Sequence, residues 1–133
     1  MSVVDTSAAM AALLDEPAAE AIRAHLQTVE APLMSAGTLQ ELGIVLEARI
    51  GAVAPAKVER FLRDSATEVV PVDRTLVDRA MAGWRQYGKG RHPAALNFGD
   101  CFAYALASTR NLPVLCTGED FARTDVRVVT LDG

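Results

Sequence analysis

The sequence predicts an α/β fold in which a central, mostly parallel sheet of about five strands lies between two layers of helices, a three-layer α/β/α arrangement. Short apolar runs alternate with longer segments whose apolar residues recur at helical spacing, the pattern of strands joined by crossover helices. No repeat, low-complexity tract or linker rich in Pro, Gly or Ser divides the 133 residues. We therefore expect a single domain over residues 1–133.

The predicted strands are short apolar runs bounded by polar or turn residues. They span residues 2–5, 31–34, 68–71, 112–116 and 126–131. Val69 and Val70 form the centre of the third strand, since β-branched side chains pack well on a pleated surface. Because helices separate the strands along the chain, parallel pairing is expected.

The predicted helices begin and end at residues suited to those positions. They span residues 5–14, 17–28, 38–50, 55–65, 73–87 and 97–110. A side chain with a capping oxygen stands before or at the start of four of them: Asp5, Ser35, Asp73 and Asn97. Pro17 favours the start of the second helix and Gly51 the end of the third. Six helices and five strands complete the expected fold.

The composition limits the class of protein. The net charge is -4 and the pI is about 5.1, which argues against a binder that holds nucleic acid by positive charge alone. If the chain handles RNA, bound divalent cations are the expected compensation. No basic leader or apolar run of about 18 residues is present, and the two cysteines lack zinc spacing. We expect a reduced, cytoplasmic protein with no membrane segment.

Three aspartates follow or begin elements at predicted strand ends. Asp5 ends the first strand, Asp100 lies just inside the last helix, and Asp120 follows the strand at 112–116. In open α/β sheets, functional groups gather at the carboxyl ends of strands. Each aspartate also has a structural explanation, as a helix cap, a variant capping box with Asn97, or a turn residue. The residues alone leave both interpretations open, and Glu119 is an alternative to Asp120.

Glu41 stands on the predicted helix 38–50 but away from its main apolar stripe. That stripe consists of Leu39, Leu42, Leu46 and Ile50. Glu41 lies beside Ile44, Val45 and Ala48, so its carboxylate is expected to be partly desolvated and to need a cation or a hydrogen-bond donor. The alternative is a flanking residue that reaches water.

Taken together, the four acids indicate a metal site. Carboxylates brought close together repel one another and do not all ionise at low cost. Such a group is tolerated when it binds Mg²⁺ or Mn²⁺, which prefer oxygen ligands. A group of acids without histidine suits phosphoryl chemistry better than zinc hydrolysis.

A basic loop precedes the last helix. Lys89 and Arg91, with the ring of Tyr87, form a candidate RNA-contacting loop, and a solvated turn is the alternative. Trp84, at helical spacing from Met81, is expected in the core.

Several stretches carry a resemblance that covers nearly the whole chain. They are residues 3–8, 87–92 followed by 95–107, and 118–125, together with 39–41 and 47–49 on the predicted third helix. They resemble PIN-domain proteins, and more closely the VapC toxins of bacterial toxin–antitoxin pairs. The stretch around Asp100 is the most specific of them.

The resemblance implies roles for particular residues. In PIN domains an acid that ends the first strand, here Asp5, and an acid that opens a late helix, here Asp100, hold the metal. A glutamate on the third helix, here Glu41, completes the ligand set, and Ser7 contributes a hydroxyl.

The fourth acid departs from the pattern of many relatives. Where those proteins have an acid two residues before the Asp-Phe pair, this chain has Gly118. The resemblance therefore assigns the fourth role to Asp120.

The resemblance also implies an activity and partners. It implies a metal-dependent endoribonuclease that uses Mg²⁺, with Mn²⁺ as an alternative, and hydrolyses RNA to leave a 5′-phosphate and a 3′-hydroxyl. It implies a homodimer and a VapB-type antitoxin whose C-terminal segment covers the active groove.

Three other functions compete with this interpretation. One is a non-catalytic RNA-binding module that inhibits translation, and another is a structural partner protein whose acids are all caps. The third is a small metal-dependent phosphatase. Such enzymes often carry an Asp-x-Asp motif after the first strand, whereas here Thr6 and Ser7 follow Asp5.

Overall fold

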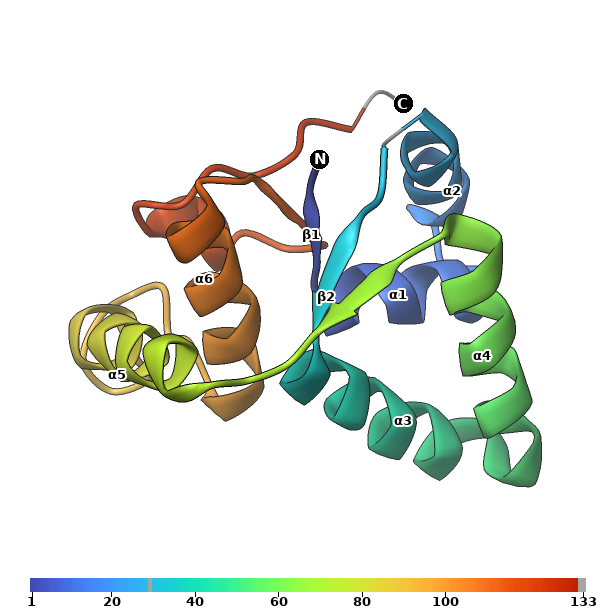
Figure 1. Cartoon of the computed structure of the whole chain (residues 1–133), viewed down its shortest axis with the longest axis horizontal. Coiled ribbons are helices and arrows are strands. Elements are labelled where there is room, and N and C mark those ends of the chain that lie inside the picture. Colours follow the sequence, from blue (N-terminus) through green and yellow to red (C-terminus); the bar gives the residue numbers. More distant parts are fainter. Residues whose placement is uncertain (29, 132–133) are drawn as a thin grey trace.

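The sheet of this protein is parallel throughout. The structure, a computed structural model, describes residues 1–28 and 30–131. Within those residues the sheet has four strands in the order β3-β2-β1-β4 (Figure 1). The strands are β1 (Val3–Val4), β2 (Leu33–Ser35), β3 (Glu68–Val70) and β4 (Val114–Leu115). Val3 of β1 pairs with Leu33 on one side and with Val114 on the other, so the carboxyl ends of these strands meet at one edge.

The helices follow the predicted order. They are α1 (Thr6–Leu13), α2 (Ala19–Thr28), α3 (Ala36–Ile50), α4 (Ala54–Ser65), α5 (Arg74–Tyr87) and α6 (Phe98–Arg110), with short 3₁₀ helices η1 (Gly51–Val53) and η2 (Phe121–Arg123). Four helices have an N-cap side chain that accepts a backbone hydrogen bond: Asp5, Ser35, Asp73 and Asn97. The predicted capping residues are therefore confirmed. Capping depends on side chains that are adjacent in the sequence, so it can be predicted without knowledge of the fold.

Two layers of helices cover the sheet. In Figure 1, α5 and α6 lie on one side of it, and α1, α2, α3 and α4 lie on the other. Consecutive strand residues point to opposite faces, as the twofold period of a strand requires. Val3, Leu33 and Val114 belong to the core beneath α5 and α6, whereas Val4, Met34 and Leu115 belong to the core beneath α1–α4. The three-layer prediction is therefore confirmed.

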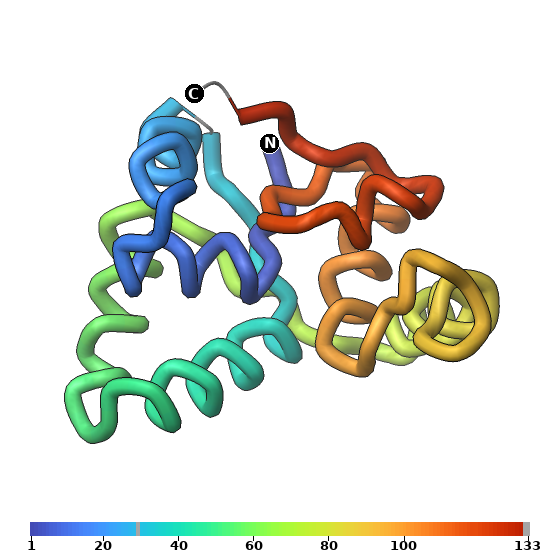
Figure 2. The backbone as a smooth tube through the Cα atoms, turned by 180° about the vertical axis from the view of Figure 1, so that it is seen from behind, coloured from blue at the N-terminus to red at the C-terminus, as the bar shows by residue number. Residues whose placement is uncertain are grey.

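The predicted fifth strand at 126–131 is wrong. This segment runs beside β4 but forms only a single bridge, between Val128 and Val114. Both backbone hydrogen bonds between the segment and β4 involve Val114. Its N donates to Arg127 O and its O accepts from Val129 N, each at 2.9 Å. Because β4 is two residues long, it offers too short an edge for a further regular strand. Figure 2 shows this last segment, in red, running to the end of the molecule where the N-terminus lies.

The prediction that Trp84 lies in the core is also wrong. The inward face of α5 is formed by Leu76, Gly83 and Tyr87, so Trp84 lies on the outer side and is 36% exposed. The guanidinium carbon of Arg91 lies 4.4 Å from the centre of its ring, a cation–π contact. In the described part of the chain, no helix has the length and apolar character needed to cross a membrane.

Candidate active site

Asp5 lies at the carboxyl end of β1 and is almost completely buried, with 3% exposed. Its carboxylate oxygen Oδ2 accepts from the Ser7 backbone N at 3.1 Å and from Ser7 Oγ at 2.7 Å. Its other oxygen, Oδ1, is buried and has no hydrogen-bond partner among the described residues. Burial raises the pKa of Asp5, and the nearby charge of Glu41 adds to the increase. A buried carboxylate oxygen without a partner is costly and calls for a cation or a donor.

Ser7 links two strand ends. Its hydroxyl donates to Asp5 and accepts from the backbone N of Thr117 at 3.0 Å. The start of α1 is thereby joined to the segment that follows β4. The hydroxyl that the resemblance assigned to the site is thus in contact with Oδ2 of Asp5, whereas Oδ1 has no partner among the residues that the structure describes.

Glu41 reaches the same edge from α3. Its carboxylate oxygen Oε1 accepts a hydrogen bond from Thr6 Oγ1. The carboxylate lies against Gly99 in the first turn of α6, and a Cβ atom at Gly99 would lie 2.5 Å from Oε1 and closer still to Oε2. The positive end of the α6 dipole favours a negative charge at this place.

Asp100 is a capping residue of α6 and lies close to the other predicted acids. It forms the predicted capping box, in which its Oδ2 accepts from Asn97 N at 3.0 Å and Asn97 Oδ1 accepts from Asp100 N at 2.9 Å. Partial burial raises its pKa to about 6, and the charges of Asp5, Glu41 and Asp120 contribute. Capping occupies Oδ2, and the influence of the three other acids on the pKa places Asp100 in the same group.

Asp120 and Glu119 lie at the exposed rim of this group. Asp120 immediately precedes η2. Its charge reaches Asp100, whose pKa it raises, and both acids raise the pKa of Cys116. The fold thus brings all four predicted acids to one edge of the sheet, with Asp120 as the most solvent-accessible member.

All four members of the group are carboxylates, so the group has only oxygen donors. Among the described residues, no three His, Cys, Asp or Glu side chains are arranged to hold a metal ion directly. Burial raises the pKa of the Cys101 thiol to about 11 and that of Cys116 to about 12, so neither thiol is an activated nucleophile near neutral pH.

Thr6 and Gly99 were missed from the sequence, although each leaves a signal there. A hydroxyl residue directly after Asp5 is placed to reach a second acid. A glycine in the first turn of a helix, one residue before Asp100, is unfavourable for the helix and indicates a close approach. What the sequence does not state is that the approaching group is Glu41, which is 58 positions away in the chain (99 minus 41).

The basic loop before α6 is held by backbone hydrogen bonds. Lys89 N donates to Leu96 O at 2.9 Å, and Leu96 N donates to Tyr87 O at 3.0 Å. The side chains of Lys89 and Arg91 remain exposed, with Arg91 stacked on Trp84. The loop leads directly into the Asn97 cap of α6, so two cations stand on the chain just before Asp100.

The raised carboxyl pKa values predict how stability depends on pH without added metal. An aspartate in the unfolded chain titrates near 3.9, whereas Asp100 in the folded chain titrates at about 6. The folded state therefore binds more protons between about pH 4 and pH 6, and the contribution of Asp100 to the free energy of unfolding falls as the pH rises through this range.

We expect Asp100→Asn to remove this fall in the free energy of unfolding with rising pH. In EDTA the melting temperature of the variant should exceed that of the parent protein near pH 7, and the difference should shrink toward pH 4. Thermal denaturation across this range measures it. A difference that is constant with pH would contradict the raised pKa.

Comparison with known proteins shows which family the chain belongs to. The sequence matches the PIN domain over residues 2–127. The chain belongs to the PIN-domain family. Within that family it is 43% identical over 129 residues to ribonuclease VapC30 of Mycobacterium tuberculosis, covering 97% of this chain and 98% of that protein. It is 42% identical over 127 residues to a ribonuclease VapC of Mycolicibacterium smegmatis, covering 96% of this chain and 98% of that one.

Solved PIN-domain structures share the fold. The structure of Mycobacterium tuberculosis VapC20, described as a sarcin-ricin loop cleaving toxin, matches with a TM-score of 0.77 at 17% identity and covers 97% of this chain and 98% of that one. VapBC2 from Rickettsia felis, bound to a promoter DNA fragment, matches with a TM-score of 0.75 at 16% identity and covers 98% of both chains. At these identities the likeness concerns the fold of the PIN domain.

Proposed function

We propose that this protein is a metal-dependent endoribonuclease and the toxin of a type II toxin–antitoxin pair. The observation that carries the proposal is the acid group at the carboxyl edge of the sheet, in which Oδ1 of Asp5 is buried and has no hydrogen-bond partner in the part of the chain that the structure describes. The similarity to proteins named VapC ribonucleases supports the same activity, and structural neighbours that include toxin–antitoxin complexes support the biological role.

The donor chemistry of the site fits a hard divalent cation. All four acids present oxygen, the ligand that Mg²⁺ and Mn²⁺ prefer, and Oδ1 of Asp5 is buried with no hydrogen-bond partner among the described residues. Asp5 and Asp100 would hold the ion, with Glu41 and Asp120 completing or supporting the ligand set. When bound, a Mg²⁺ ion supplies Lewis-acid stabilisation of negative charge on the scissile phosphate and lowers the pKa of a water.

The chain's own residues orient these acids. Ser7 fixes one oxygen of Asp5 and so directs the other into the site. Thr6 holds Glu41 from one side, and the bare backbone at Gly99 admits it from the other. Asn97 restrains Asp100 through the capping box. Positioning of this kind matters because displacement of a catalytic group by about 1 Å costs roughly 100-fold in rate.

Lys89 and Arg91 are the proposed RNA contacts on the loop that precedes α6. They are exposed and carry positive charge on the segment that leads into α6. A phosphate backbone near four carboxylates needs nearby cations, and these side chains supply charge that the protein as a whole lacks. The guanidinium of Arg91 lies over the Trp84 ring and has five N–H donors that could bind a phosphate oxygen.

Cleavage of a total-RNA pool tests the activity. Purified protein free of antitoxin is incubated with Mg²⁺, with Mn²⁺ and with EDTA, and the new RNA ends are mapped. We expect discrete cuts that carry 5′-phosphates and vanish in EDTA. RNA binding that survives EDTA without any cut would favour the non-catalytic RNA-binding alternative, and hydrolysis confined to small phosphoesters would favour a phosphatase.

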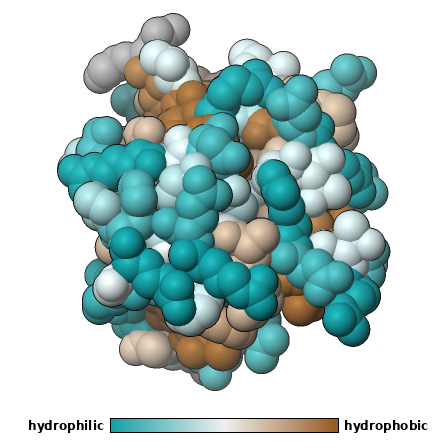
Figure 3. All heavy atoms as spheres, turned by 90° about the vertical axis from the view of Figure 1, so that its left-hand side faces the viewer, coloured by the Kyte–Doolittle hydropathy of each residue, from teal (hydrophilic) through white to brown (hydrophobic). Residues whose placement is uncertain are grey.

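An exposed apolar patch is the proposed surface for a second copy of the chain. We define the apolar patch by the exposed side chains Ile44, Val45, Val77, Met81, Trp84 and Phe98. Two hollows that share Phe98 and Phe102 make it continuous from α3 to α5. Figure 3 views the molecule from the α5 side, where a largely hydrophilic face borders hydrophobic residues toward the end at which α6 begins. Large exposed apolar areas of this kind mark interaction sites.

We expect Met81→Glu to convert a homodimer into a monomer, because a charge in a desolvated interface lacks a partner. Sedimentation or light scattering measures the mass. Val53→Glu is the matched control, since Val53 is 55% exposed on η1 and lies outside the apolar patch. Equal masses for the two variants would contradict the assignment of this surface.

A further inference from the structure

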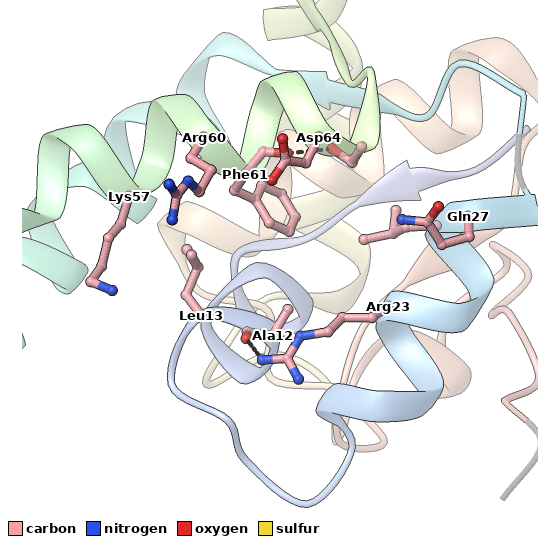
Figure 4. A pocket seen from close by; sticks show the side chains of 10 residues that line it. Ala12, Leu13, Arg23, Gln27, Lys57, Arg60, Phe61 and Asp64 are labelled. Atoms are coloured by element: carbon pink, nitrogen blue, oxygen red, sulfur yellow. Dashed lines mark hydrogen bonds between the residues drawn. The ribbon is translucent and has the colours of Figure 1, made fainter.

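A second candidate site lies within the helix layer formed by α1–α4, between α1, α2 and α4. It is a pocket of about 340 Å³, within the size range of small-ligand pockets. Arg23 from α2 and Lys57 and Arg60 from α4 line it, and Asp64 is the one acid among its lining residues (Figure 4). In a chain of net charge -4, a hollow lined by three cations and one acid is locally basic, although Asp15 already pairs with Arg23 beside it.

The cations of this pocket differ in whether they already have an ion-pair partner. Among the residues described, neither Lys57 nor Arg60 makes an ion pair. Arg23 is held in place, since its Nη1 donates to Asp15 Oδ1 at 3.0 Å and its Nη2 donates to the backbone oxygen of Ala12. A guanidinium has five donors, so the fixed Arg23 keeps others for an incoming anion.

The pocket also contains an aromatic ring. The half-buried side chain of Phe61 lies between the helices next to Arg60, with Leu13 across from it (Figure 4). Positive charge beside an aromatic face is the combination with which proteins hold single-stranded nucleic acid, the cations taking phosphates and the ring stacking on a base. A purely inorganic anion would make no stacking contact with the ring.

Helix α1 connects this pocket to the acid group. Thr6 at the start of α1 contacts Glu41, and Leu13 at its end lines the pocket. Seven residues of helix rise by about 10 Å. Successive phosphates of a stacked strand are about 3.4 Å apart along its axis, so a strand placed on the acids reaches the pocket within about three nucleotides.

We propose that Arg23, Lys57 and Arg60 form a second binding site, which takes a phosphate of the RNA substrate a few nucleotides from the cleaved bond and places a neighbouring base against Phe61. This rests on the proposed ribonuclease function for the identity of the strand, but its binding step is independent of cleavage. The site extends RNA recognition along α1, away from Lys89 and Arg91.

The test is RNA binding measured in EDTA. Fluorescence anisotropy follows a labelled oligouridylate of about 15 nucleotides, a length within the range of single-strand sites. The variants are Lys57→Gln and Arg60→Gln, singly and together. Arg63→Gln is the matched control, because it removes the same charge from the same helix and Arg63 does not line the pocket.

We expect the double variant to bind roughly tenfold more weakly and to lower the slope of log K against log salt by about 0.7, because one phosphate of the strand is no longer neutralised. Arg63→Gln should change both quantities much less. Equal losses in the double variant and in two-charge controls that combine Arg63→Gln with Arg49→Gln would mean a general charge effect, and would overturn the proposal.

Two further measurements separate this proposal from its rivals. The RNA that the protein cleaves is shortened stepwise, and the double variant should raise KM only for substrates long enough to reach the pocket. If nothing is cleaved, the binding experiment still decides on the pocket, so the two proposals fail separately. Binding of oligoglutamate that disappears in the double variant, with RNA binding unchanged, would overturn the RNA assignment in favour of an acidic peptide.

Discussion

Asp5→Asn is expected to lower RNA cleavage by more than roughly 100-fold while the fold is retained. Loss of a residue that only supports a metal ligand costs about 10- to 100-fold, and loss of a proposed ligand should exceed that. Asn has the same shape as Asp, so its oxygen can still accept from Ser7. Its NH₂ group then takes the place of the partnerless Oδ1 and offers a cation a donor instead of a negative oxygen.

The measurement is kcat/KM on a defined RNA, with circular dichroism as the check on folding. Asp100→Asn should behave in the same way, because its amide oxygen can still accept from Asn97 in the capping box. Asp78→Asn is the control: Asp78 makes an exposed ion pair with Arg74 on α5, and exposed pairs contribute little. Full activity in Asp5→Asn or Asp100→Asn would refute the assigned role.

Gly99→Ala is expected to reduce cleavage by about 100-fold with little loss of stability. The new methyl group would overlap the carboxylate of Glu41. That carboxylate is the far end of a flexible side chain, so it can swing aside and leave the fold intact. It then loses its place beside Asp100, and a displacement of about 1 Å is enough for a loss of this size.

A matched control variant and a double-mutant cycle separate an effect on the position of Glu41 from a general disruption of the fold. Gly43→Ala, in the middle of α3, meets nothing within 4 Å and should raise stability by about 0.5–1 kcal/mol with unchanged activity. In a Glu41→Ala background the clash and the carboxylate are both absent, so Gly99→Ala should cause no further loss. Additive losses in this double-mutant cycle would mean that Gly99 acts other than through Glu41.

The sequence predicts most where structure is set by neighbouring residues. The caps at Ser35 and Asp73 and the capping box of Asn97 with Asp100 are written in adjacent side chains, and the structure confirms them. Alternation of strands and helices likewise predicts the parallel sheet. Trp84 could not be placed, because residues 81 and 84 and residues 83 and 87 are both helically spaced pairs, and only tertiary packing selects which face turns inward.

The strand predicted at 126–131 failed for a similar reason. Its residues have the propensity for a strand, but pairing also needs an edge, and β4 ends after Leu115. Within the candidate site, strand ends located Asp5 and the Asp120 corner, and the spacing on α3 singled out Glu41. The contacts of Glu41 with Thr6 and Gly99 join segments far apart in the chain, and a single sequence carries no direct record of such contacts.

The acid group draws its members from both helix layers. Glu41 is carried by α3, whose Leu42 and Leu46 belong to one core, whereas Asp100 is carried by α6, which packs in the other. The sheet between them is only two residues long at β1 and β4. A small sliding of one layer past the other would therefore separate the acids before either core came apart. The positions of the acids relative to one another therefore depend on how the two helix layers pack across the sheet. We expect this arrangement to be lost at lower temperature or denaturant concentration than the fold itself.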